Sequence, residues 1–124
     1  MSSRFSRTPI SEGAALISIH AKLRGSVARE LEGVLRDLAQ EGVSRVVLDC
    51  RTQGSIDSVG TFALEKGLDS GLRLHLVVSP MFDFDTFFRA KSLTRRGLRV
   101  HTNGDLDEAV AQVRGIVESG FALV

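Results

Sequence analysis

The chain has 124 residues, 43% of them hydrophobic and 25% charged, and its 16 basic and 15 acidic side chains give a formal net charge of +1. A chain of this length buries roughly two thirds of its unfolded surface, so we expect one domain, residues 1–124, with a single core. The balanced charge argues against nucleic-acid binding, the single cysteine excludes an internal disulfide, and the lack of a long apolar segment or secretory signal predicts a cytoplasmic protein without stable membrane insertion.

The first predicted elements are two strands that form a hairpin, followed by a helix. Residues 5–10 can form a weak strand that ends in a turn at 11–13, and residues 14–21 form a clearer one because apolar side chains occupy every second position. For the helix, Ser26 is the expected N-cap and Glu41-Gly42 the expected end. Its apolar stripe consists of Val27, Leu31, Val34, Leu35 and Leu38.

Strands and helices alternate over the rest of the chain. Strands are predicted at 45–50, 72–78 and 98–101, and helices at about 57–70, about 80–93 and about 105–117. Gly97 is expected to end the middle helix, and Asp105 with Glu108 forms a capping pattern at the start of the last one.

This order predicts an α/β fold with a mixed sheet of four to five strands. In the strands, apolar side chains alternate with polar ones such as Asp49, Arg73 and His75, whereas a sheet covered on both faces would be apolar on both. We therefore expect helices mainly on one face and the other face open to water or to a partner. Together with the absence of a GxGxxG sequence, this argues against a dinucleotide-binding fold.

The segment 55–61 carries the most information about function. Asp57 and Ser58 stand where a loop ends and a helix begins, and there the first backbone N–H groups are unpaired and the helix dipole is positive. Such a site can hold a phosphate added to Ser58, with the N–H groups of Gly60 and Thr61 directed at it. The alternative is that Asp57 or Ser58 only caps the helix.

The same segment, in its context, resembles a known family signature. Ile56-Asp57-Ser58-x-Gly60, after the strand that includes Val46-Val47-Leu48-Asp49, looks like the central signature of the STAS domain family, best known from bacterial anti-sigma factor antagonists. The early strand and helix, the strand at 71–77 and the segment 105–110 are similar to the corresponding family segments. The resemblance covers about residues 14–117 and implies one STAS-like domain.

The resemblance implies a regulatory binding protein with no catalytic residues, metal or cofactor. In the family, the unphosphorylated antagonist binds an anti-sigma factor that is also a serine kinase, which releases the sigma factor and so regulates transcription. The kinase phosphorylates the serine that corresponds to Ser58, and a serine phosphatase removes the phosphate. A phosphate adds about −1.5 to −2 charge and opposes docking. The alternative is a non-phosphorylated STAS module of a larger stress-sensing or lipid-transport assembly, and a homodimer is left open.

Some positions differ from the family pattern. Arg24 stands where many antagonists have an acidic residue, and Val59 where a second hydroxyl is usual. Thr61-Phe62 replaces a common Leu-Gly pair. We hypothesise that Arg24 lies near Ser58 and pairs with a phosphate there, which would moderate the repulsion.

Four of the seven phenylalanines cluster near the third helix, and two interpretations compete for them. With Asp83 as N-cap, Phe82 and Phe87 form a hydrophobic staple and the cluster belongs to the core; the alternative is an exposed docking patch, with Met81 and Phe82 the most exposed. In the family this helix adjoins the partner-binding surface. The expected partner-binding residues are therefore Arg24, Asp57, Ser58, Val59, Gly60, Thr61 and Phe82.

The remaining reactive side chains have ordinary interpretations and one alternative. The basic residues between 89 and 99 are expected to be solvated, and Cys50 to be an inert core thiol. His20, His75 and His101 are expected on the polar sheet face, where a metal-binding or pH-sensing cluster is conceivable. A deep pocket at that face would favour an enzyme or a small-ligand binder.

Overall fold

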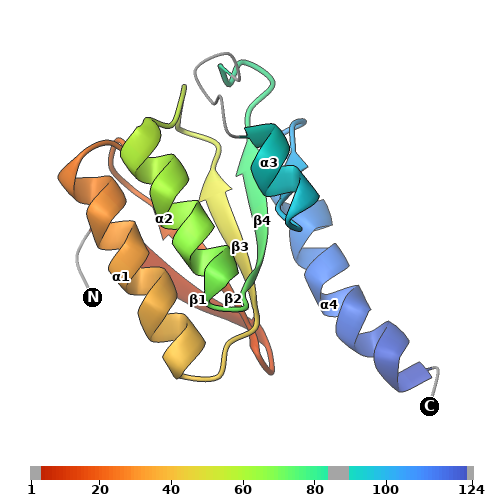
Figure 1. Ribbon diagram of the computed structural model, residues 1–124. Helices are drawn as coiled ribbons and strands as arrows, with labels where there is room; N and C mark the ends of the chain where they lie inside the picture. The colour runs from red at the N-terminus through yellow and green to blue at the C-terminus, as the bar shows by residue number, and fades with distance from the viewer. Residues whose placement is uncertain (1–3, 84–89, 123–124) are drawn as a thin grey trace.

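The computed structural model describes residues 4–83 and 90–122 (Figure 1). The strands in these residues are β1 (Phe5–Ser11), β2 (Ala14–Ile19), β3 (Arg45–Cys50), β4 (Arg73–Val78) and β5 (Arg99–His101). The helices are α1 (Ser26–Gln40), α2 (Ser58–Asp69), α3 (Ala90–Arg95) and α4 (Leu106–Ala122). The order of elements predicted from the sequence is confirmed.

The strands form one mixed sheet in the order β1-β2-β3-β4-β5. β1 and β2 are antiparallel, and each of the later neighbouring pairs is parallel. The register places Ile17 beside Leu48 and Leu48 beside Leu76, so these apolar side chains share one face. Because β2 and β3 are parallel, the loops that follow them start at the same edge of the sheet, and these two loops form the candidate site.

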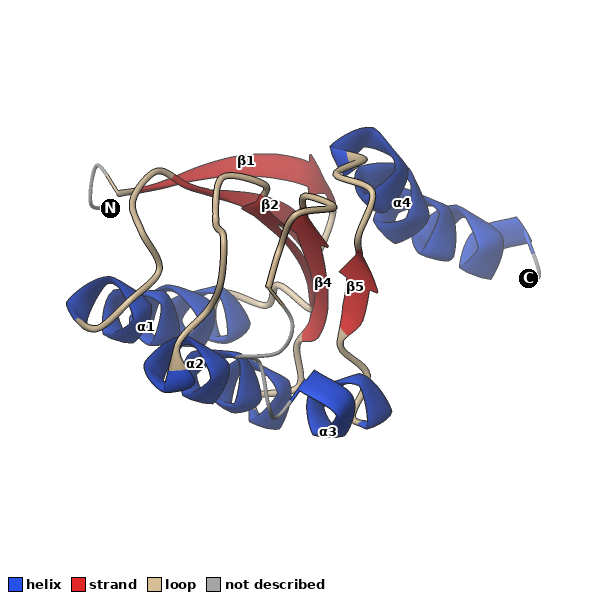
Figure 2. Cartoon of the chain, turned by 90° about the horizontal axis from the view of Figure 1, so that it is seen from above, coloured by secondary structure: helices blue, strands red, loops and turns tan. Residues whose placement is uncertain are grey.

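Three helices cover one face of the sheet (Figure 2). α1 and α2 lie side by side, α3 lies next to α2, and the larger core fills the space between these helices and the sheet. Its fully buried side chains include Ile17, Leu48 and Leu76 from the strands and Leu31 and Leu64 from the helices. The predicted α/β class, with helices mainly on one face, is confirmed.

The expectation that the other face is open is wrong, because α4 packs across it (Figure 2). Val47 and Val77 make the centre of this face apolar, and α4 places Ala109 and Val113 against them in a second, smaller core. Arg45 is buried beside this contact, where its guanidinium donates to the carbonyl oxygen of Val113 over 3.1 Å. The sequence predicted an open face because polar side chains such as Asp49 and Arg73 flank the two valines along the strands.

The helix ends agree with the sequence only in part: α2 ends at Asp69, near its predicted end, but α3 ends at Arg95 and α4 at Ala122, beyond their predicted ends at about 93 and 117. Ser26 is the first helical residue, not the N-cap, and the cap position is taken by Gly25 with a φ of 53° and no side-chain hydrogen bond. Asp105 caps α4 as predicted, since its Oδ1 accepts from the N–H of Glu108 over 2.9 Å. None of the helices in the described residues is long and apolar enough to cross a bilayer.

The segment after β4 differs from its prediction in two respects. Met81 is 87% exposed, as expected, but Phe82 is only 5% exposed and belongs to the larger core, so its predicted exposure is wrong. Two hydrogen bonds turn the chain inward here: the N–H of Phe82 donates to Ser79 O, and that of Asp83 to Gly54 O. The predicted helix start near residue 80 is also wrong, because residues 80–83 form a turn and loop and the next described helix, α3, begins at Ala90. The staple partner Phe87 lies outside the described residues.

Candidate functional site

The candidate site lies where two loops meet, the loop of residues 20–25 after β2 and the loop of residues 51–57 after β3. Gln53 joins them and is 6% exposed. Its Oε1 accepts from the N–H of Leu23 over 2.9 Å, and its Nε2 donates to the carbonyl oxygen of Ala21 over 2.8 Å. One buried amide therefore satisfies both a donor and an acceptor of the other loop, which fixes their relative position.

Asp57 makes a second connection between the loops and also caps α2. One carboxylate oxygen accepts from the N–H of Gly60 over 2.9 Å, and the other accepts from the N–H of Gly25 over 3.1 Å. Its carbonyl oxygen accepts from both the N–H and the hydroxyl of Thr61. The capping interpretation of Asp57 is thus confirmed.

These bonds correct one expectation about phosphate binding. The N–H groups of Gly60 and Thr61, which the sequence placed toward an oxyanion on Ser58, are both directed at Asp57 instead. The carboxylate of Asp57 takes the N–H of Gly60, where an anion would have bound. The N–H of Thr61 bonds to the backbone carbonyl oxygen of Asp57, as in the first turn of a helix.

Gly60 and Thr61 are both buried, so neither presents a side chain at the surface of the site. A Cβ on Gly60 would stand 2.4 Å from Cγ2 of Ile56, which is itself fully buried, so no side chain fits there without movement. Their role is to hold the first turn of α2 against the loop.

Ser58 and Arg24 are the exposed members of the predicted set. Ser58 is the first residue of α2. Arg24 belongs to the same pair of loops, and its guanidinium donates to the hydroxyl of Ser55 over 3.1 Å. Arg24 is thus bonded to a residue three positions before Ser58. That it pairs with a phosphate on Ser58 stays a hypothesis.

A shallow groove runs beside Ser58 between α1 and α2, and we call it the Ser58 groove. It has a volume of about 350 Å³ and is lined by Arg29, Glu32, Ser58, Val59 and Phe62. Phe62 is 42% exposed, with the ammonium of Lys66 5.2 Å from its ring centre. An apolar ring, a cation and a hydroxyl thus share one surface at the start of the helices.

Sequence reasoning missed Arg29 and Phe62 at this site. A signal existed, because helices that follow two neighbouring parallel strands run parallel themselves and start at the same end (Figure 1). The first turn of α1, which contains Arg29, is therefore level with the first turn of α2.

The other reactive side chains lie elsewhere. Cys50 is fully buried, and burial, with a smaller effect of the Asp49 charge, raises the pKa of its thiol, as expected of an inert core residue. Burial acts to raise the pKa of Asp49, but hydrogen bonds and charge from Arg51 lower it overall.

The three histidines do not form one cluster. His75 and His101 share a hydrogen bond, but His20 bonds to Ser6. Over residues 4–83 and 90–122 no three histidine, cysteine or acidic side chains come together as a metal site would require.

Comparisons with known proteins show the fold. No protein-family model matches the chain, and no curated protein matches it either. Among solved structures, that of the anti-sigma factor antagonist SpoIIAA in its unphosphorylated form aligns with a TM-score of 0.68 at 16% sequence identity, covering 90% of this chain and 96% of that one. The chain therefore has the fold of that antagonist, which is the STAS fold expected from its sequence.

Proposed function

We propose that this chain is a regulatory protein-binding domain that acts as an anti-sigma factor antagonist. In this proposal it docks on an anti-sigma factor that is also a serine kinase while Ser58 carries no phosphate, and a serine phosphatase restores that form. The observation that carries the proposal is the exposed Ser58 at the first position of α2, in a fold shared with an antagonist described in its unphosphorylated form.

The docking surface in this proposal is the Ser58 groove with Arg24 at its edge. It joins the partly exposed ring of Phe62, the half-buried Val59 and the guanidinium of Arg29 around the hydroxyl. Aromatic and arginine side chains are the types that contribute most at protein interfaces. Gly60, Thr61 and Phe82 are buried and do not line this groove, so they are not part of the docking surface.

A phosphate on Ser58 would act at the surface and leave the fold unchanged. The N–H groups of Gly60 and Thr61 are already bonded to Asp57, so they are not available to draw the phosphate inward. An added charge of about −1.5 to −2 would then stand on the groove that the partner must cover. Desolvating that charge opposes docking, and the switch needs no rearrangement of α2.

Phosphorylation and binding test the proposal together. The protein is incubated with ATP and the anti-sigma factor kinase proposed as its partner, and its intact mass is measured. We expect one added phosphate in the wild type and in Ser55→Ala, which removes a neighbouring hydroxyl, and none in Ser58→Ala. In binding assays we expect Ser58→Ala to bind like the wild type and Ser58→Asp to bind at least about tenfold more weakly.

Two results would contradict the proposal. One is an unmodified Ser58 together with full binding by Ser58→Asp. The other is stable co-purification with a large complex that is indifferent to Ser58→Ala, which would instead identify a STAS module of a larger assembly.

A further inference from the structure

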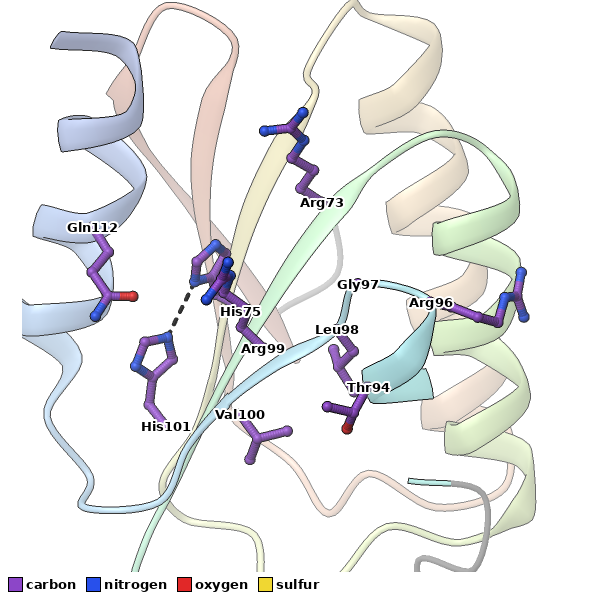
Figure 3. A pocket seen from close by; sticks show the side chains of 10 residues that line it. All are labelled: Arg73, His75, Thr94, Arg96, Gly97, Leu98, Arg99, Val100, His101 and Gln112. Atoms are coloured by element: carbon purple, nitrogen blue, oxygen red, sulfur yellow. Dashed lines mark hydrogen bonds between the residues drawn. The ribbon is translucent and has the colours of Figure 1, made fainter. Parts of the chain in front are cut away.

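A larger groove lies beside β5, the last strand of the sheet, and we call it the β5 groove (Figure 3). It has a volume of about 780 Å³, within the range of sites for small molecules. It is bounded by β4, β5, the end of α3 and one side of α4, and it shares no residue with the Ser58 groove. Its lining residues are Arg73, His75, Thr94, Arg96, Gly97, Leu98, Arg99, Val100, His101 and Gln112.

The charges of the β5 groove are all of one sign. Three arginines and two histidines line it, and no lining residue is acidic. Arg96 is paired with Asp69, away from the groove centre. Arg73 and Arg99 are exposed, and within the part of the chain that the structure describes neither guanidinium has an ion pair or a side-chain hydrogen bond. Two positive charges are therefore free to bind an anion.

Two histidines stand beside Arg99 on the floor of the groove (Figure 3). Nδ1 of His75 and Nε2 of His101 share a hydrogen bond over 3.1 Å, and the rings stack with centres 5.4 Å apart. This bond uses one nitrogen of each ring and leaves the second nitrogen of the half-exposed His101 for another partner. Burial, with the charges of His101 and Arg99, lowers the pKa of His75 to about 4. His75 is therefore neutral at pH 7, and the fixed positive charge of the groove comes from its arginines.

We propose that the β5 groove binds a small molecule through a phosphate group, held by Arg73 and Arg99 with His101 and Gln112 as further hydrogen-bond donors. Planar guanidinium groups bind phosphate oxygens in pairs, and a dianion suits two unpaired arginines. The groove is much larger than one phosphate, and the half-buried Val100 gives it an apolar side for the rest of the molecule. This site goes beyond the proposed docking function and does not depend on Ser58.

Inorganic pyrophosphate, titrated into the ¹⁵N-labelled full chain at constant ionic strength, is the probe. We expect saturable amide shifts concentrated at residues 73–75 and 97–101. Arg99→Gln and Arg73→Gln should each weaken binding at least about fivefold, since each removes a charge-assisted contact. Arg95→Gln is the matched control, because Arg95 is exposed at the end of α3 but does not line the groove. It should change the affinity less than about twofold.

The location of the shifts separates this proposal from the docking function. Ser58→Asp should bind pyrophosphate as the wild type does, whatever its effect on partner binding. The proposal is overturned if the shifts centre on α2, if they do not saturate, or if the Arg73, Arg95 and Arg99 variants all lose affinity equally. Folding of each variant is checked by its melting temperature. Because Arg73 and Arg99 are both exposed, either variant alone suffices for the comparison.

Discussion

The two grooves differ in how their polar groups are satisfied. At the Ser58 end, Gln53 and Asp57 bond to backbone groups of both loops, so the polar groups there are largely used within the chain. At the β5 end, the guanidinium groups of Arg73 and Arg99 have neither an ion pair nor a hydrogen bond among the described residues. The first region is suited to presenting one hydroxyl on a rigid surface, whereas the second is suited to receiving a charge from outside.

The largest expected effect concerns acid stability at the β5 groove. The folded-state pKa of His75, about 4, lies below the ordinary value of about 6.5 that holds in the unfolded chain. As the pH falls below 6.5, His75 becomes protonated in the unfolded chain but stays neutral in the folded one. The free energy of unfolding therefore decreases until about pH 4 and then levels off. The loss from this group is at most about 3 kcal/mol.

Urea unfolding between pH 4 and 7 measures this dependence. The variant His75→Gln should show a flatter profile than the wild type, and the remaining slope comes from carboxylates such as Asp49. His20→Gln is the control, since His20 is exposed and stands apart from the pair. Equal slopes in the wild type and His75→Gln would show that the histidine pair is open to solvent, and the contrast between the two regions would lose its basis.

The next effect tests the rigidity of the Ser58 end. Gly60→Ala places a methyl group against Ile56, and we expect a loss of about 2 kcal/mol even though alanine favours helices over glycine. Gly54→Ala is the matched control in the loop before α2, because nothing lies within 4 Å of its added Cβ, and it should stay within about 0.5 kcal/mol of the wild type. Chemical denaturation measures both values, and similar losses in the two variants would contradict the close packing.

A third effect separates capping from the connection between loops. Asp57→Ala should cost about 2 kcal/mol, since it removes a helix cap and the bond to Gly25, whereas Asp105→Ala removes only a cap and should cost about 1 kcal/mol. Hydrogen exchange gives the local readout: the Gly25 amide should exchange faster in Asp57→Ala and unchanged in Asp105→Ala. If Gly25 keeps its protection without Asp57, Gln53 alone holds the loops together.

The sequence predicted those features that depend on nearby residues. The element order, the mixed sheet and the caps at Asp57 and Asp105 follow from patterns a few residues long. Gly25 rather than Ser26 occupies the N-cap position of α1. The N–H of Gly25 bonds to Asp57, which is 32 residues away. No short window contains that information.

The predictions that were wrong or incomplete also depend on residues far apart in the sequence. Phe82 is buried because the next residue bonds to Gly54, and α4 covers the second face because Val47 and Val77, on different strands, meet there. Arg29 reaches the Ser58 groove only through the side-by-side packing of α1 and α2. Each depends on which segments become neighbours, and that is settled by the core as a whole.

The smallest effect concerns Arg24, whose exposed bond to Ser55 should contribute less than about 0.5 kcal/mol to stability. Its importance is expected only when Ser58 carries a phosphate, because a guanidinium can then leave the hydroxyl for a doubly charged group. Arg24→Asp should weaken partner binding of the phosphorylated chain about two- to fivefold more than it weakens binding of the unphosphorylated chain. Lys22→Asp introduces the same charge at an exposed position of the same loop and should leave both forms nearly unchanged. Equal binding of phosphorylated wild type and Arg24→Asp would remove Arg24 from the switch, and the phosphate on Ser58 would then act through repulsion alone.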